Sequence, residues 1–218
     1  MIKKIFSLLI SFTIKKQLRN FWTLAHDYAQ YKTIKSGLPI DKDGKEVPWY
    51  TYPAIEFLNH LDFSDKTIFE WGSGSSSVYW AIKAREVMTV ETDELWMSNL
   101  EAKKRGNQKV TLIKDKDKYI NSILDLKQKF SVIIIDDKYR NECVNNAYVC
   151  LEDGGMIILD NSDWFPEAVE SLRGFGLIQV DFHGFGPVNS YTWTTSIFFN
   201  KDYKFNYLKN LCSLHAVK

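Results

Sequence analysis

The chain has 218 residues, of which 45% are hydrophobic and 25% are charged, and this balance excludes a wholly disordered protein. Its 28 basic and 27 acidic residues give a net charge of +1, which argues against a dedicated nucleic-acid binder. The charge is unevenly distributed, because residues 1–20 carry five cations and no acid. The length predicts one large domain, with or without a short appendage.

The N-terminal segment is amphipathic. Its apolar run, residues 5–14, is shorter than the roughly 20 residues that span a membrane. Lys15 and Lys16 stand where a signal peptide would carry a small-residue cleavage site. On a helix, one face collects Ile2, Ile5, Phe6, Leu9 and Phe12. We expect residues 1–20 to pack on their own domain, to contact a second copy in a homodimer, or to attach peripherally to an anionic membrane.

The three cysteines predict no metal site. Cys143, Cys150 and Cys212 lack the paired Cys or Cys/His spacing of zinc ligands. We expect reduced, buried thiols in a cytoplasmic protein.

The chain divides at one evident loop, SGLPIDKDGKEVP over residues 36–48. Before it lies a helical region, and we predict residues 1–50 to form an N-terminal amphipathic helix with a lid or loop region. Trp49, Tyr50 and Tyr52 are expected either as part of that lid, as a platform for adenine, or as core. Residues 51–218 are predicted to form the main domain.

Within the main domain, strands alternate with helices. The expected strands cover residues 67–71, 87–91, 109–113, 130–135, 156–159, 177–182 and 194–199, and the expected helices cover residues 54–61, 76–83, 94–104, 118–127, 141–151 and 166–172. This alternation predicts a parallel sheet covered on both faces. Eleven residues, 183–193, join the last two strands, which is short for a helical crossover and suits an antiparallel hairpin. The predicted fold is a three-layer α/β sandwich around a seven-stranded, mostly parallel sheet with one reversed strand in the C-terminal hairpin.

The first strand ends in a glycine-rich turn, EWGSGSSS, which begins at Glu70. Gly72 and Gly74 permit a tight turn with a ligand pressed against the backbone, and the next helix offers free N–H groups. A dinucleotide fingerprint would place a third glycine at Ser77, and Glu70 would repel a phosphate but attract an ammonium or sulfonium. Glu91 ends the next strand, 19 residues after Gly72, where an acid accepts hydrogen bonds from ribose hydroxyls.

With these motifs, roughly residues 52–200 resemble the class I S-adenosylmethionine-dependent methyltransferases, whose fold is Rossmann-like. The resemblance rests on motifs at successive strand ends: EWGSGSS (70–76), VETD (90–93), IIIDDKYR (133–140) and LEDGGMIILDN (151–161). The resemblance implies a methyltransferase-like domain over residues 51–218 and S-adenosylmethionine as cofactor.

The same resemblance assigns cofactor contacts residue by residue. The implied contacts are Glu70, Gly72, Ser73, Gly74, Glu91, Asp115 and Asp136. Glu70 would lie near the methionine end of the cofactor, Glu91 at the ribose, and Asp115 at the adenine. Other roles stay open, because Glu70 can pair with a lysine, the glycines can simply form a turn, and Asp115 lies in the charged run KDKDK.

Methyl transfer from a sulfonium needs no protein nucleophile, only alignment and, for a hydroxyl acceptor, a base. The candidate catalytic residues are Asp136 and His183, although a lone histidine at a strand end is commonly structural.

The same strand ends suggest a metal. Asp136, Asp160 and Asn161 offer oxygen ligands for Mg²⁺, in an arrangement similar to that of metal-dependent catechol-type O-methyltransferases. Members of that group carry a basic residue a few positions beyond the first Asp, where Lys138 and Arg140 are available. In metal-free members, aspartates at both places serve for capping and for binding the cofactor ammonium.

The acceptor is implied only by resemblance to small bacterial methyltransferase-like proteins, some of which are linked to surface glycans. A hydroxyl of a small molecule or glycan is therefore expected, with the aromatic loop 183–193 providing specificity. No D/N-P-P-Y/F motif and no basic stripe suggests a nucleic-acid substrate. Two alternatives stay open: aminopropyl transfer on the same fold, hinted at by Asp136 and Asp137, and a non-catalytic partner subunit.

Overall fold

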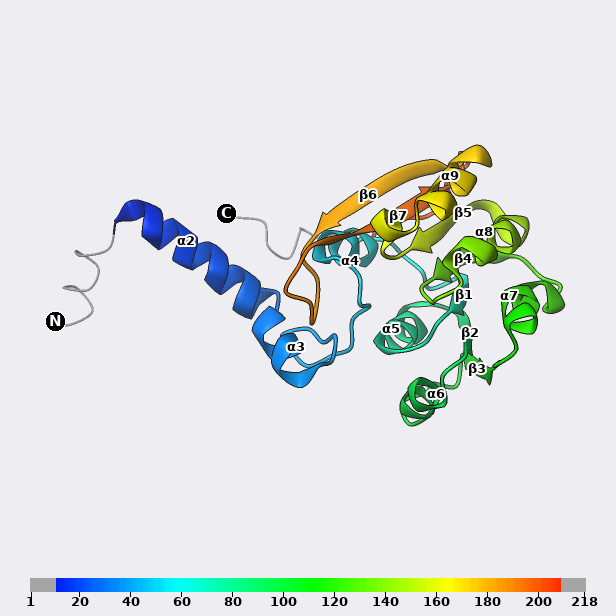
Figure 1. Cartoon of the computed structure of the whole chain (residues 1–218), viewed down its shortest axis with the longest axis horizontal. Helices are drawn as coiled ribbons and strands as arrows, with labels where there is room; N and C mark the ends of the chain where they lie inside the picture. The colour runs from blue at the N-terminus through cyan, green and yellow to red at the C-terminus, as the bar shows by residue number, and fades with distance from the viewer. Residues whose placement is uncertain (1–10, 209–218) are drawn as a thin grey trace.

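A seven-stranded sheet organises the computed structural model, which describes residues 11–208 (Figure 1). The strands are β1 (Thr67–Trp71), β2 (Glu86–Glu91), β3 (Gln108–Leu112), β4 (Phe130–Ile135), β5 (Leu151–Leu159), β6 (Ile178–Gly184) and β7 (Trp193–Phe199). Their order is β3-β2-β1-β4-β5-β7-β6, and β7 runs antiparallel to both of its neighbours while the other pairs are parallel. The predicted mostly parallel sheet with one reversed strand is confirmed.

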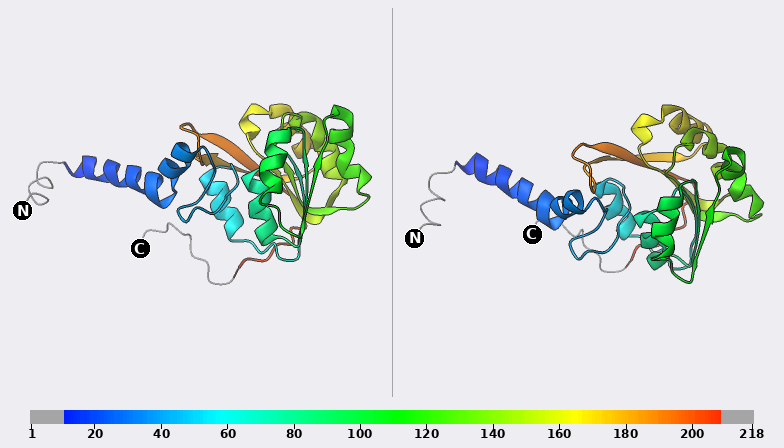
Figure 2. Two further views of the ribbon diagram at one scale, coloured as in Figure 1. Left: turned by 90° about the horizontal axis from the view of Figure 1, so that it is seen from below. Right: turned by 60° about the horizontal axis from the view of Figure 1, so that its bottom comes forward.

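Helices cover both faces of this sheet (Figures 1 and 2). One layer contains α4 (Tyr52–Asn59), α5 (Ser75–Lys83) and α6 (Glu94–Glu101), and the other contains α7 (Lys116–Asp125), α8 (Arg140–Val149) and α9 (Pro166–Gly174). The predicted three-layer, Rossmann-like α/β sandwich is thus the observed architecture.

The central strand β4 is buried along its whole length, as its apolar run FSVIII predicts. Its side chains alternate between the layers, with Val132 and Ile134 in the core under α4 and α5, and Ile133 and Ile135 in the core under α7 to α9. Each such side chain contributes roughly 1.5–3 kcal/mol through burial. This strand holds the loop that follows it in a fixed position at the centre of the sheet.

Strand β5 begins at Leu151, five residues before its predicted start. Gly154 and Gly155 lie inside the strand, where they allow close backbone contact. A Cβ on Gly154, whose φ is +82°, would lie 2.4 Å from the carbonyl oxygen of Asp202, and one on Gly155 would lie 2.8 Å from that of Ser131. The pairing with β4 shifts register at the same place, which is typical of a β-bulge.

The N-terminal part consists of α2 (Phe12–Trp22), a π-helical turn η1 (Thr23–Asp27) and α3 (Gln30–Ser36). Helix α2 extends away from the sheet domain, whereas α3 packs against the β6–β7 loop (Figure 2). The Gln30 amide donates a hydrogen bond to the Asn189 carbonyl (3.2 Å), and Thr33 Oγ1 accepts one from Val188 N (2.9 Å). The predicted apolar face of residues 2–9 lies outside the described residues.

Cys143 and Cys150 are buried free thiols at one side of α8, as predicted, and burial raises the pKa of both. Cys212 lies outside the described residues. Within residues 11–208, no helix combines the length and hydropathy that a membrane span requires.

Candidate active site

Two cavities open where the carboxyl ends of the strands meet, next to the point between β1 and β4 at which the strand order reverses. The first, here the turn cavity, has a volume of about 390 Å³ and lies between the glycine-rich turn, the end of β2 and the loop after β4. The second, here the aromatic cavity, measures about 230 Å³ and lies between the ends of β4 and β5 and the β6–β7 loop. Trp49 and Asp136 line both cavities, so the two adjoin.

The turn cavity contains most of the predicted cofactor residues. It is lined by Gly72, Ser73, Gly74, Glu91 and Asp136, and also by Trp49, Thr92, Asp93, Trp96, Asp137 and Lys138.

Gly72 allows two loops to touch. Its φ is +97°, and a Cβ there would lie 2.3 Å from the carbonyl oxygen of Asp136. Gly72 N donates to Val90 O (3.0 Å), while Asp136 N donates to Trp71 O (3.1 Å). The glycine is therefore required by the neighbouring backbone and not only by a ligand.

Glu91 is fixed at the end of β2. Its Oε1 accepts hydrogen bonds from the backbone N–H groups of Thr92 (2.6 Å) and Asp93 (2.9 Å), and its Oε2 accepts one from Ser73 Oγ (2.7 Å). A carboxylate has about four acceptor positions, so Oε2 keeps one for a ligand hydroxyl.

Glu70 lies behind the glycine-rich turn and lines neither cavity. It is fully buried and accepts hydrogen bonds from the hydroxyls of Ser76, Ser77 and Thr89. Burial raises the pKa of Glu70 to about 8, against the opposing effect of the Ser76 and Ser77 hydroxyls. In place of the predicted contact with the methionine end of a cofactor, its contacts tie β1 to α5 and β2.

Arg140, the first residue of α8, is the centre of the loops after β4 and β5. Its Nε donates to the Asp160 carbonyl oxygen (3.0 Å) and its Nη1 to the Asp137 carbonyl oxygen, while Nη2 donates to Asp136 Oδ1 and Asn161 Oδ1 (3.2 Å). The guanidinium carbon also lies 4.9 Å from the centroid of the Phe165 ring. The side chain is only 10% exposed, so one buried cation binds four oxygens.

This arrangement corrects the predicted magnesium site. The guanidinium binds Asp136 Oδ1 and Asn161 Oδ1, and Asp160 Oδ1 instead accepts from Thr195 Oγ1 (2.5 Å) and Trp193 Nε1 (3.1 Å). A dication would compete with a cation that is already bound there. In residues 11–208, no three His, Cys, Asp or Glu side chains are placed to hold a metal. The residues present do not fit Mg²⁺.

Burial raises the pKa of Asp136, while the Arg140 charge opposes the rise. Burial, together with the charge of Asp136, raises the pKa of Asp160 well above its ordinary value. The two buried carboxyl groups lie close to one guanidinium, which binds only that of Asp136, and this cluster takes up a proton more readily than exposed aspartates would.

Besides Glu70, two further predicted residues lie outside both cavities. Asp115 is exposed and caps α7 by accepting a hydrogen bond from Lys118 N (2.9 Å). His183 is exposed on β6, and its Nδ1 lies 2.9 Å from Thr194 Oγ1. The geometry therefore gives neither one a contact with a ligand in these cavities.

Two aromatic residues were missed. Trp96, in α6, lines the turn cavity with its ring 3.6 Å from the place where Gly74 would carry a Cβ. Trp164 lines the aromatic cavity with Tyr191 and Trp193, and lies in the 3-10 turn η2 (Ser162–Trp164). Each lies five residues after the end of a strand. A search for site residues that extends five residues beyond each strand end therefore identifies both.

Solved structures of methyltransferases share this fold. A precorrin-6y C5,15-methyltransferase from Geobacter metallireducens superposes with a TM-score of 0.57 at 14% identity, over 76% of this chain and 95% of that one. A Streptococcus mutans methyltransferase in complex with S-adenosylhomocysteine superposes with a TM-score of 0.50 at 14% identity, over 66% of this chain and 94% of that one. A spermidine synthase from Thermotoga maritima superposes with a TM-score of 0.51 at 18% identity, over 71% of this chain and 57% of that one.

For two further methyltransferase structures, this chain spans about half of their length, 46% and 47%. No family model and no curated protein sequence matches the chain. At these identities the similarity establishes the class I methyltransferase fold.

Glu70 predicts a specific pH dependence of stability. Its pKa of about 8 in the folded protein exceeds its ordinary value of 4.5, so the folded state holds a proton that the unfolded state has lost between these values. This group therefore lowers the free energy of unfolding as pH rises from 4.5 to 8. In Glu70→Gln, the loss of stability across this range should be smaller than in the wild type by about 4 kcal/mol. Urea unfolding at several pH values measures it, and identical pH profiles would contradict the assignment.

Replacing Arg140 should destabilise the protein strongly. Arg140→Met leaves the buried Asp136 carboxylate and two carbonyl oxygens without their donor, which costs about 3–5 kcal/mol. The matched control Arg173→Met removes an exposed arginine of α9 and should cost less than about 0.5 kcal/mol. Equal unfolding free energies for the two variants, measured in urea, would refute the central position of Arg140.

Proposed function

We propose that the protein is an S-adenosylmethionine-dependent methyltransferase that methylates a hydroxyl of a small molecule or glycan. The observation that carries the proposal is the meeting of two cavities at Trp49 and Asp136, one suited to the cofactor and one to the acceptor. On a methyltransferase fold, such a junction places a transferable group beside its acceptor.

The turn cavity fits the cofactor in charge and in donors. Its lining includes the carboxylates of Glu91, Asp93, Asp136 and Asp137 and the single cation Lys138, which favours a ligand with ammonium and sulfonium groups. Glu91 Oε2 keeps an acceptor position for a ribose hydroxyl, and Trp96 offers a flat apolar surface for a base. When bound, S-adenosylmethionine supplies a methyl group on a cationic sulfur, from which an acceptor oxygen takes it directly.

The aromatic cavity fits a ring with hydroxyl groups. Trp164, Tyr191 and Trp193 lie beside one another, with ring centroids 6.3 Å and 6.0 Å apart along that series. Asn161 and Asn189 add amide groups to the lining. Flat apolar surface bordered by a few polar groups suits the faces and edges of a sugar or other small ring, and the volume of about 230 Å³ suits one such ring.

Asp136 would accept the proton of the acceptor hydroxyl. Arg140 binds its Oδ1, whereas Oδ2 accepts no hydrogen bond from a residue within 11–208. Burial raises the pKa of Asp136, which makes it a stronger base, and Arg140 holds the carboxylate in one orientation. Asp136 therefore serves as general base.

Aminopropyl transfer is less well supported. A polyamine acceptor needs several uncompensated carboxylates for its second ammonium, but in the aromatic cavity Arg140 already neutralises Asp136, and Asp160 Oδ1 accepts from Thr195 and Trp193. The cavity presents aromatic surface to its ligand instead.

Calorimetric titration with S-adenosylhomocysteine tests the cofactor site. The wild type should bind, and Glu91→Gln should bind at least about tenfold more weakly because the ribose loses a charge-assisted hydrogen bond. Glu86→Gln is the matched control on the same strand, since Glu86 pairs with Lys109 outside the cavity. EDTA should leave the affinity unchanged.

Three results would contradict this assignment. Absence of wild-type binding at millimolar ligand refutes the methyltransferase and leaves the non-catalytic subunit. Equal losses of affinity in Glu91→Gln and Glu86→Gln would refute the turn cavity as the cofactor site. A requirement for Mg²⁺ in cofactor binding would refute the conclusion that Arg140 binds Asp136 and Asn161 in place of a metal.

Asp136→Asn tests the base. With S-adenosylmethionine and a mixture of methyl hexopyranosides as probe acceptors, the wild type should yield O-methylated sugar detectable by mass spectrometry. The variant should form product about 10²- to 10⁴-fold more slowly, because the amide cannot accept the proton. Retained activity in Asp136→Asn would exclude it as base, and failure of the wild type to methylate any probe would exclude simple hexoses as acceptors.

A further inference from the structure

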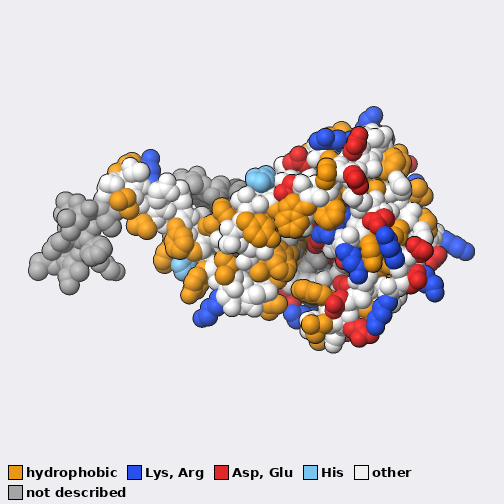
Figure 3. Space-filling view, in the orientation of Figure 1, with side chains coloured by type: hydrophobic (Ala, Val, Ile, Leu, Met, Phe, Trp, Pro, Cys, Tyr) orange, Lys and Arg blue, Asp and Glu red, His pale blue; other side chains and the backbone are white. Residues whose placement is uncertain are grey.

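Helix α2, here called the arm, has a large apolar surface that no other part of residues 11–208 covers. None of its residues is buried, and it extends away from the sheet domain (Figures 1 and 2). Its large apolar side chains, each at least half exposed, are Phe12, Ile14, Leu18, Phe21 and Trp22. Figure 3 shows hydrophobic side chains gathered along the arm. An isolated protein gains nothing by exposing so many large side chains together, so this surface indicates a partner.

The arm carries most of its apolar side chains and all of its cations on two adjoining arcs of the helix. At 100° per residue, four of its apolar side chains fall in one arc of about 100°. These are Ile14, Leu18, Phe21 and Trp22. The adjoining arc holds all three cations of the helix, Lys15, Lys16 and Arg19, and residues 11–26 contain no acid. The apolar arc is thus bordered by cations on one side and by the uncharged Gln17, Thr13 and Asn20 on the other, and Phe12 lies among the cations.

We propose that the arm lies in the interface of an anionic phospholipid membrane. The apolar arc would be buried at the level of the first acyl carbons, and the three cations would meet lipid phosphates. Trp22 lies at the edge of the apolar arc and has both an apolar ring and an N–H, the combination that favours the membrane–water boundary. This proposal is independent of the proposed catalytic function.

Charge and length favour a lipid surface over a second copy of the arm. The helix has 11 residues, about three turns, whereas a coiled coil needs three or more heptads. Two arms packed together would also bring six cations into proximity without an acid to neutralise them. An anionic membrane supplies both the apolar phase and the opposite charge.

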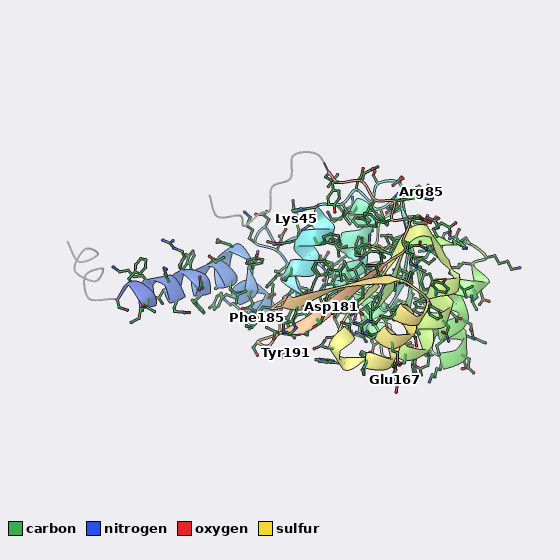
Figure 4. All side chains as sticks on the ribbon, turned by 90° about the horizontal axis from the view of Figure 1, so that it is seen from above. Lys45, Arg85, Glu167, Asp181, Phe185 and Tyr191 are labelled. Carbon is green, nitrogen blue, oxygen red and sulfur yellow. The ribbon has the colours of Figure 1, made fainter. Side chains whose placement is uncertain are left out.

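The base of the arm brings further apolar side chains to the same end of the molecule. Figure 4 shows Phe185 and Tyr191, from the β6–β7 loop, beside the region where the arm meets the domain. Both side chains are exposed, and α3 holds this loop through Gln30 and Thr33. Helix α3, which follows the arm in the chain, is therefore connected to this loop by part-buried hydrogen bonds.

Cosedimentation of the full chain with vesicles tests the proposal. The protein should bind vesicles of equal parts phosphatidylserine and phosphatidylcholine, and bind pure phosphatidylcholine vesicles far more weakly. The triple variant Lys15→Glu, Lys16→Glu, Arg19→Glu should bind the anionic vesicles at least about a hundredfold more weakly, since each cation near the surface adds about fivefold. Phe21→Ser with Trp22→Ser should weaken binding to both compositions.

A matched control separates local from total charge. Lys118→Glu, Lys129→Glu, Lys201→Glu changes the net charge equally at exposed positions outside the arm, and should bind like the wild type. Equal binding to both vesicle types, or equal losses in the two triple variants, would overturn the proposal. So would a dimer in sedimentation equilibrium that dissociates in Phe21→Ser, Trp22→Ser while neither vesicle is bound, because the arm would then be a contact between copies.

Discussion

The Arg140 guanidinium holds the candidate active site together. It binds four oxygens from the loops after β4 and β5, and it does so from the first position of α8, where the helix dipole disfavours a cation. The position is tolerated because the oxygens surround the charge and Phe165 covers it. From this one interaction follow the orientation of Asp136, the boundary between the two cavities and the poor fit of the site to magnesium.

The glycine-rich turn depends on the same loops. Gly72 approaches the Asp136 backbone so closely that a side chain is excluded, while Glu70 anchors the turn from behind through three hydroxyl groups. Glu91 and Ser73 close the turn cavity from the side of β2. On the opposite side, α3 holds the β6–β7 loop, so the N-terminal region contributes to the shape of the aromatic cavity. The two halves of the site are thus fixed by different parts of the chain and meet at Trp49 and Asp136.

The sheet could be predicted because short stretches of sequence are enough to determine its strands and their connections. The apolar run FSVIII marks a strand buried on both faces, and the short link between the last two strands forces a hairpin. Parallel topology then brings Gly72, Glu91 and Asp136 to one edge. The direction in which a side chain points, and the partner that it binds, could not be predicted in this way. Strand-end spacing places Glu70 near the turn but does not say that it points inward, and it does not say that Arg140 rather than a metal binds Asp136 and Asn161. The β5 start was misplaced because a bulge and a turn both use glycine.

The central claim is that the cofactor and the acceptor meet at the boundary formed by Trp49 and Asp136. A crystal structure of the protein with S-adenosylhomocysteine tests it most directly. The ribose should lie at Glu91, the sulfur should lie beside Asp136 and face the aromatic cavity, and Arg140 should still bind Asp136 and Asn161. A ligand outside the turn cavity, or a sulfur turned away from Asp136, would show that cofactor and acceptor do not meet at this boundary.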